Sequence, residues 1–230
     1  MRNRAEDQIV LALIRHGETE ANARRRYLGK TDESLSERGK QLLLSYKEQN
    51  LYPKAAYLFA SPMKRCVETA EILYPTRKPI IVSEWEEMDF GRFEYKNYEE
   101  LKDDPAYQQW IDSGGMADFP GGESRETFLF RCGTGFRKMY GMLQKAQAEN
   151  QRENVAEPVR AAAIVHGGTI MALLSSYAKG DCQKGYFDYQ AANGRGYLCR
   201  IGCRNQNAAS GDGKVEAAAP AIWIEEITEI

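Results

Sequence analysis

The sequence is poor in histidine: it holds two, His16 and His166, among 230 residues. It also has no apolar run near the roughly 20 residues that a bilayer-spanning helix needs, which argues against a transmembrane protein. Lys and Arg total 31 against 33 Asp and Glu, so the net charge is −2, and the basic excess typical of nucleic-acid-binding proteins is missing. We therefore expect neither a membrane nor a nucleic acid as a partner.

Cysteine is scarce as well, and the five residues follow no recognisable pattern. An odd number of scattered cysteines favours a reducing compartment, and the N-terminal segment lacks a secretory cleavage site, so we expect a cytoplasmic protein. Cys199 and Cys203 flank three residues, but neither a second cysteine pair nor a spare histidine completes a zinc set. We expect no metal and no cofactor.

The chain does contain a regular alternation of apolar runs and helical patterns. Strands are predicted from the apolar, partly β-branched runs at 9–14, 56–62, 79–83, 161–165, 196–203 and 221–227, the last two as a hairpin. Helices are predicted after Ser36, over 63–73 and over 169–178. This alternation predicts an α/β fold, a three-layer α/β/α sandwich around a mainly parallel sheet. We expect one domain, 1–230, with a helical insertion at about 97–150 over the carboxyl edge of the sheet.

The two histidines occur in similar surroundings, LALIRHGETEAN and AAAIVHGGTIMA. Each directly follows a predicted strand, and ligands of open α/β sheets bind beyond the carboxyl ends of the strands. Gly17 and the pair Gly167–Gly168 allow sharp turns that expose amide N–H groups there. Taken singly, each histidine is also compatible with a cap that satisfies a buried carbonyl. The repeated context favours a shared site.

Two arginines accompany the histidines at predicted strand ends. Arg15 precedes His16, and Arg65 begins the helix that follows FASP. A guanidinium group offers a planar fork of donors that suits phosphate oxygens, so this set predicts a pocket for a phosphoryl dianion. Asn22, a few residues beyond His16, adds an amide donor. The basic cluster 24–26 is interpreted as a solvated loop or as the rim of this site.

Four segments in this order, RHGETEAN, SPMKRCVETA, EEMDFG and VHGGT, resemble the motifs of the histidine phosphatase (phosphoglycerate mutase-like) superfamily, over about residues 9–178. The resemblance implies that His16 is the nucleophile and forms phosphohistidine. It further implies that Arg15, Arg65 and His166 clamp the phosphate, with Asn22 contributing. A neutral imidazole suits this role, because a phosphomonoester dianion repels an anionic nucleophile and nearby cations disfavour imidazolium.

The proton donor implied by the resemblance is Glu87 of EEMDFG. A carboxyl group beside a phosphate dianion should have a raised pKa, so it can protonate the leaving alkoxide and later activate water. Its neighbours Glu84, Glu86 and Asp89 are rivals that only the register of the motif ranks below it. Glu18 is interpreted as a residue that orients the first histidine loop.

Three further segments, RYLGKTDESLSERG, MDFGRFE and FPGGESRETFLFR, resemble α-ribazole phosphatases, which act in cobalamin synthesis. The resemblance implies that Leu28 and Gly29 lie in the loop facing the substrate, and Gly167 is a further expected substrate contact. Tyr27 and Lys30 also qualify as ligand contacts at the mouth of the site. Phe90, Phe93 and Tyr95 qualify as contacts to a ring of the substrate, with a core position as the favoured alternative for Phe90. Tyr95 stands where many relatives have glycine.

The sequence therefore predicts an enzyme, a metal-independent phosphoric monoester hydrolase that acts on a small phosphorylated metabolite, with an α-ribazole phosphatase-like role as its specific form. One alternative is a phosphoglycerate mutase, which shares the first half-reaction but excludes water; the segment MDFGRF argues against it. The other is a non-catalytic member that binds a phospho-ligand or a protein partner, although this chain keeps both the nucleophile and the acid.

Overall fold

The computed structural model describes residues 9–153, 155, 157–204 and 221–230. Its centre is a six-stranded sheet with the order β3-β2-β4-β1-β5-β6. The strands are β1 (Ile9–Arg15), β2 (Tyr57–Ala60), β3 (Ile80–Ile81), β4 (Val159–Val165), β5 (Gly196–Arg204) and β6 (Ala221–Glu229). The first four strands of this order run parallel, whereas β5 is antiparallel to both of its neighbours. The predicted α/β fold with a mainly parallel sheet and a late hairpin is confirmed.

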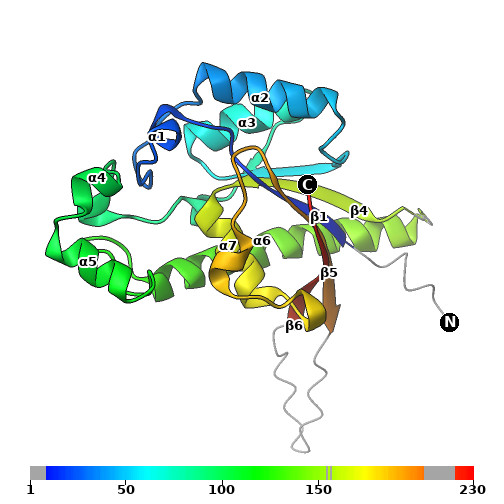
Figure 1. Ribbon diagram of the computed structural model, residues 1–230. Helices are drawn as coiled ribbons and strands as arrows, with labels where there is room; N and C mark the ends of the chain where they lie inside the picture. Colours follow the sequence, from blue (N-terminus) through cyan, green and yellow to red (C-terminus); the bar gives the residue numbers. More distant parts are fainter. Residues whose placement is uncertain (1–8, 154, 156, 205–220) are drawn as a thin grey trace, which may run out of the picture.

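Helices and 3₁₀ turns connect the strands (Figure 1). The α-helices are α1 (Glu20–Ala23), α2 (Glu37–Glu48), α3 (Lys64–Leu73), α4 (Tyr98–Leu101), α5 (Pro105–Asp112), α6 (Arg125–Arg152) and α7 (Gly167–Tyr177). The 3₁₀ turns are η1 (Ser83–Trp85), η2 (Gly91–Phe93), η3 (Gly180–Cys182) and η4 (Tyr186–Tyr189). The predicted cap is present, because the side chain of Ser36 accepts a hydrogen bond from the Gly39 amide at the start of α2. None of the helices in the described part of the chain has the length and hydropathy to cross a bilayer.

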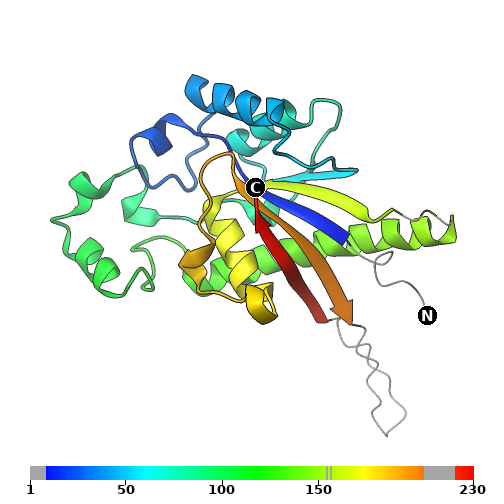
Figure 2. The same ribbon diagram turned by 45° about the vertical axis from the view of Figure 1, so that its right-hand side comes forward.

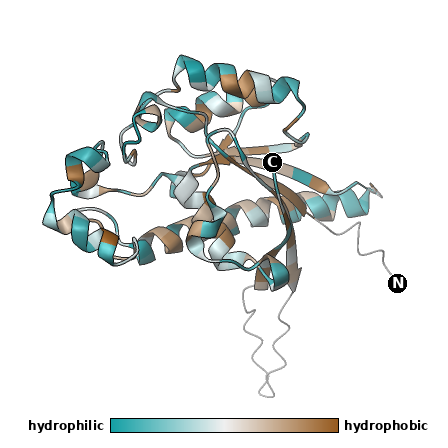
Figure 3. Cartoon of the chain, in the orientation of Figure 1, coloured by the Kyte–Doolittle hydropathy of each residue, from teal (hydrophilic) through white to brown (hydrophobic). Residues whose placement is uncertain are grey.

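The sheet is buried on both faces because successive side chains of a strand point in opposite directions. On β1, Leu11 and Leu13 face a core formed with α6 and α7, whereas Ala12 and Ile14 face a core formed with α2 and α3. Figures 1 and 2 show these helix pairs on opposite sides of the sheet. In Figure 3 the central strands are brown and the outer faces of the helices are largely teal.

The polar stretch 97–150 divides into two parts with different positions. The short helices α4 and α5 lie beyond the carboxyl edge of the sheet, away from its strands (Figure 1). Helix α6, in contrast, forms part of a sandwich layer, since Phe136, Met139 and Leu143 belong to the core beneath the sheet. The insertion over the edge is therefore narrower than the sequence predicts.

Strand β3 is shorter than predicted, two residues in place of the run 79–83. It pairs only with Phe59 and Ala60, because β2 ends there before Ser61. Ile80 and Ile81 lie at the edge of the sheet and remain 40% and 48% exposed.

Candidate active site

The two histidines lie side by side at the carboxyl edge of the sheet. Strands β1 and β4 are parallel neighbours whose last residues, Arg15 and Val165, are in register. The next residue of each strand end is a histidine, and the ring centroids of His16 and His166 are 5.2 Å apart. The geometry thus brings together two residues that are 150 positions apart in the chain.

The ring of His16 has a defined tautomer. It is 3% exposed, and its Nδ1 lies 2.7 Å from the carbonyl oxygen of Gly17, to which it donates a hydrogen. Nε2 then carries the free lone pair. Burial, followed by the charges of Arg65 and Arg15, holds the pKa of His16 well below its usual range. The imidazole is therefore neutral at physiological pH, as the sequence argument requires.

His166 is fully buried and is fixed by the end of β2. Its Nε2 is 2.8 Å from the hydroxyl oxygen of Ser61, and the sulfur of Cys66 lies 3.6 Å from the same nitrogen. Burial and the charges of Arg65, His16 and Arg15 keep the pKa of His166 well below its usual range. A charged His166 is compatible with the sequence alone, but its surroundings favour a neutral ring that acts as a hydrogen-bonding group.

Both guanidinium groups are held by backbone carbonyls. Arg65 has no exposed surface, and its two terminal nitrogens each donate at 2.8 Å, to the carbonyls of Thr31 and Gly29. Arg15 donates to the carbonyl of Ala191 at 2.8 Å. In both side chains the Nε–H has no hydrogen-bond partner within the described residues. Buried donors of this kind are costly unless a ligand accepts from them, so this pair fits an anion.

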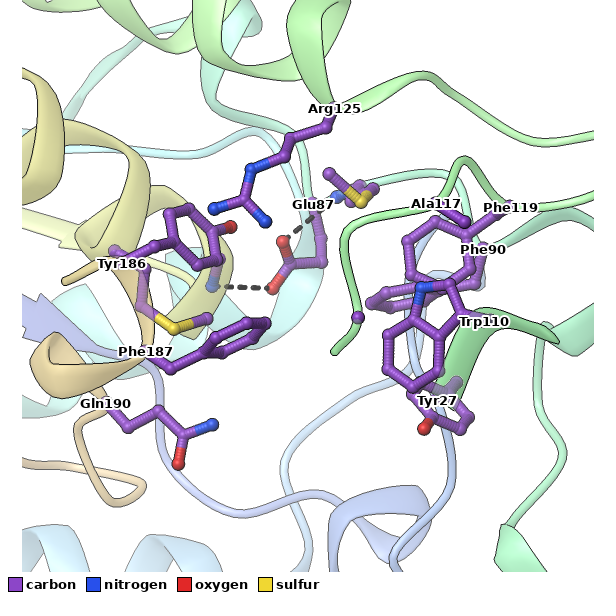
Figure 4. A pocket seen from close by; sticks show the side chains of 14 residues that line it. Tyr27, Glu87, Phe90, Trp110, Ala117, Phe119, Arg125, Tyr186, Phe187 and Gln190 are labelled. Carbon is purple, nitrogen blue, oxygen red and sulfur yellow. Dashed lines mark hydrogen bonds between the residues drawn. The ribbon is translucent and has the colours of Figure 1, made fainter. Parts of the chain in front are cut away.

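Glu87 follows η1 and is 9% exposed (Figure 4). One carboxylate oxygen accepts from the Met88 amide at 2.9 Å and the other from the Gly168 amide at 3.4 Å. Burial raises the pKa of Glu87, and the Met88 amide and the two active-site arginines only partly oppose this effect. A carboxyl group with a raised pKa is suited to general acid catalysis.

The acidic rivals of Glu87 are placed differently. Glu84 pairs with Lys138, and Asp89 forms an ion pair with Lys30 at 2.7 Å. The side chain of Glu86 is exposed. Of these four acidic residues, only Glu87 lines the cavity that contains His16. The register of the EEMDFG motif therefore selects the one carboxyl group that faces the histidines.

The cavity at this edge has a volume of about 570 Å³. Six of the residues predicted for the site line it: Arg15, His16, Asn22, Leu28, Glu87 and Gly167. The N-terminus of the eleven-residue helix α7 begins there, with amide groups and a partial positive charge that favour anions. A Cβ atom at position 168 would lie too close to the Glu87 carboxylate, so a larger residue there would displace this carboxylate.

Gly29 does not line this cavity, in contrast to the expected substrate contact. Its amide donates to both carboxylate oxygens of Glu94, at 3.0 and 3.1 Å, and its carbonyl holds Arg65. The described geometry thus gives Gly29 a supporting position behind the guanidinium group. Arg65 and His166 likewise lie in the wall, fully buried behind the cavity surface.

Among the aromatic candidates, Phe90 lines the cavity, and so does Tyr27 at the mouth. Phe93 is fully buried in a separate aromatic core. The hydroxyl of Tyr95 donates to Glu33 at 3.0 Å, on the outside of the loop. Lys30 is tied to Asp89 and does not line the cavity.

The loop after η4 was missed by sequence reasoning. Gln190, Ala191 and Ala192 line the cavity. The side-chain amide of Asn193 donates to Asn22 Oδ1 at 3.0 Å and to the carbonyl of His16 at 3.2 Å. Because the oxygen of Asn22 is occupied, its NH₂ group remains as the donor. The only signal in the sequence was the polar run AANGRG, which is also typical of an ordinary turn.

The fold and the site define a class: α/β proteins that hold two imidazoles and two guanidinium groups at the carboxyl edge of the sheet. A family model described as histidine phosphatase superfamily (branch 1) matches residues 11–202. The chain therefore belongs to the histidine phosphatase superfamily, branch 1, as its four motifs indicated.

Several individual proteins are similar to this chain. Phosphoserine phosphatase 1 of Hydrogenobacter thermophilus is 26% identical over 151 residues, which cover 64% of this chain and 68% of that protein. Phosphoglycerate mutase-like protein 4 of Arabidopsis thaliana is 28% identical over 174 residues, covering 73% and 70%. The crystal structure of the α-ribazole phosphatase from Shigella flexneri has a TM-score of 0.66 at 21% identity, covering 85% of this chain and 91% of that one. The last likeness establishes the fold alone.

Proposed function

We propose that this protein is a phosphomonoesterase that works through a phosphohistidine at His16. The observation that carries the proposal is the orientation of the His16 ring. Its Nδ1 is engaged by the Gly17 carbonyl, so the lone pair on Nε2 is free in a cavity that also contains Glu87 and Arg15. This arrangement supports phosphoryl transfer to nitrogen.

In the first half-reaction, Nε2 of His16 attacks phosphorus, and the bond between phosphorus and the ester oxygen breaks. Glu87 donates its proton to that oxygen, so the product leaves as a neutral alcohol. The transition state places negative charge on the three equatorial oxygens, and the guanidinium groups of Arg15 and Arg65 stabilise it.

In the second half-reaction, a water molecule attacks the phosphorus of phosphohistidine and the bond between nitrogen and phosphorus breaks. Glu87, now a carboxylate, accepts a proton from this water and is ready for the next cycle. Inorganic phosphate leaves. The catalytic groups of both half-reactions are all side chains of this protein.

As the specific substrate class we propose phosphate esters of small metabolites with a flat aromatic group, the class to which α-ribazole phosphate belongs. The support comes from the segments RYLGKTDESLSERG and FPGGESRETFLFR, and from the apolar side chains of Tyr27, Leu28 and Phe90 at the mouth of the cavity. A polar triose phosphate would find few partners on these side chains.

The proposal is tested by hydrolysis of 4-nitrophenyl phosphate in the presence of EDTA. We expect turnover in the wild-type protein and a loss of at least about 1,000-fold in kcat for His16→Ala, because the nucleophile is removed. The control is Arg152→Gln, at the exposed far end of α6, which should retain wild-type turnover. Undiminished activity of His16→Ala would contradict the mechanism.

The same preparation distinguishes a hydrolase from a mutase. Incubation with 3-phosphoglycerate and a bisphosphate primer should release inorganic phosphate or give no reaction. Sustained formation of 2-phosphoglycerate without release of phosphate would mean that the protein is a mutase and that the proposed hydrolase activity is wrong.

A further inference from the structure

A second cavity of about 280 Å³ adjoins the cavity that contains His16. Six residues line both: Tyr27, Glu87, Phe90, Gly168, Met171 and Gln190. Glu87 stands at this border, and in the proposed mechanism it protonates the ester oxygen. The alcohol portion of the substrate must extend from that oxygen, so the second cavity is the space into which it leads.

The walls of this second cavity are mainly aromatic (Figure 4). Trp110 and Phe119, from α5 and the loop after it, lie on one side, with ring centroids 5.4 Å apart. Tyr186 and Phe187 of η4 lie on the other side, and Phe187 is 42% exposed. Flat apolar groups gain most from such walls, through removal of area from water and through ring contacts.

One cation lies within these aromatic walls. The guanidinium carbon of Arg125 is 3.8 Å from the ring centroid of Tyr186 and 5.8 Å from that of Phe187. One of its terminal nitrogens donates to the sulfur of Met116 at 3.0 Å. Among the described residues no carboxylate lies within ion-pair distance of Arg125. The fork of donors is thus available to a ligand.

We propose that the second cavity binds the alcohol portion of the substrate, and that this portion is a flat aromatic group preferred when it carries a carboxylate or a similar anion that reaches Arg125. The proposal rests on the phosphomonoesterase function above. The substrate then has two anionic ends, one at Arg15 and Arg65 and one at Arg125, separated by an apolar body. A three-carbon ester such as O-phosphoserine would leave the aromatic walls in contact with water.

The test compares two esters with similar phenol leaving groups, 4-ethylphenyl phosphate and 4-(carboxymethyl)phenyl phosphate. O-phosphoserine is the small reference. We expect the wild-type kcat/KM for the carboxylated ester to exceed that for the ethyl ester by about tenfold, which is typical of a charge-assisted hydrogen bond. Arg125→Gln should reduce this ratio to near one, and Arg125→Lys should restore part of it.

Two matched controls separate binding from folding. Arg152→Gln, on the same helix, should keep the wild-type ratio of the two aryl esters. Phe187→Ala should lower kcat/KM for both aryl esters relative to O-phosphoserine by about fivefold, as expected for loss of part of an apolar wall. Phe130→Ala, at a position 71% exposed on α6, should leave kcat/KM for the aryl esters unchanged relative to that for O-phosphoserine.

The outcomes distinguish the two proposals. If the aryl esters are hydrolysed but the ratio of kcat/KM for the carboxylated ester to that for the ethyl ester is near one in the wild type, the anionic preference is wrong. The same holds if this ratio is unchanged in Arg125→Gln. In both cases the phosphomonoesterase function stands. If O-phosphoserine exceeds both aryl esters in kcat/KM, the aromatic assignment is wrong. Absence of hydrolysis of every ester would remove both proposals.

Discussion

At the scale of single residues, the site depends on imidazoles that stay neutral while surrounded by cations. His16 and His166 are 3% and 0% exposed, Arg65 is fully buried beside them, and the Nε atom of the half-buried Arg15 is buried as well. Burial and like charge act in the same direction on an imidazole. For Glu87 burial acts in the opposite sense and favours its protonated form. Burial thus keeps the proposed nucleophile, His16, neutral and shifts the proposed acid, Glu87, toward its protonated form.

The role of Glu87 predicts a dependence on the leaving group. Glu87→Gln should lower kcat/KM, which reports on the first half-reaction, by about 100-fold or more for an alkyl phosphate, whose alkoxide needs a proton. The loss in kcat/KM should be much smaller for 4-nitrophenyl phosphate, because nitrophenolate leaves without a proton. Steady-state kinetics with the two esters measures this contrast. Glu84→Gln is the matched control, and equal losses on both esters in Glu87→Gln would contradict the assignment.

The depressed pKa of His166 predicts a dependence of stability on pH. The folded protein resists protonation of this ring, whereas the unfolded chain binds the proton near pH 6.5. The free energy of unfolding should therefore fall as pH falls below about 6.5, by at most about 1.4 kcal/mol per pH unit for each such histidine. Glu87 acts in the opposite direction, since its raised pKa favours the folded state at lower pH.

The contribution of His166 is isolated by comparison with His166→Gln. Urea unfolding of both proteins at pH 5.5, 6.5 and 7.5 gives the two slopes of free energy against pH. The slope should be smaller in the variant, because one group that titrates only in the unfolded chain is gone. Identical slopes would mean that His166 titrates normally in the folded protein.

At the scale of elements, helix α6 holds the segment that carries Glu87. Arg131 donates to the carbonyls of Glu84, Glu86 and Glu87, at 2.9, 2.6 and 3.0 Å. The same guanidinium group forms a two-point pair with Glu123, with both distances 2.7 Å. One side chain thus joins α6, the PGGES turn and the acid-bearing segment, which fixes the carboxyl group relative to the histidines.

This arrangement makes Arg131 a positioning residue. Arg131→Lys keeps the charge but cannot reach three carbonyls and a carboxylate together. We expect kcat for an alkyl phosphate to fall by about 10- to 100-fold, by analogy with the loss on removing residues that orient metal ligands, with little change in KM. Arg137→Lys, on the same helix and hydrogen-bonded to Tyr177, is the control. If kcat falls to the same extent in Arg131→Lys and in the control Arg137→Lys, the effect is structural and Arg131 has no positioning role.

At the scale of the whole molecule, the parts of the fold and the site that are marked by local patterns could be predicted from the sequence. Buried parallel strands have continuous apolar runs, so β1 and β4 and the histidines after them were predictable. Arg65 and Glu87 followed from motifs of the family. The functions of Arg131 and Asn193 depend on contacts over 44 or more positions in the chain, and no local pattern marks such contacts. The same holds for Arg125, whose ring partner Tyr186 is on a distant turn.

The central claim is that His16 receives the phosphoryl group. The most direct measurement is rapid quenching of the wild-type protein with ³²P-labelled substrate, followed by localisation of the label by mass spectrometry. We predict an acid-labile, base-stable phosphoryl group on His16, absent from His16→Ala and longer-lived in Glu87→Gln. Turnover without any phosphoprotein, or label on a residue other than His16, would contradict the account.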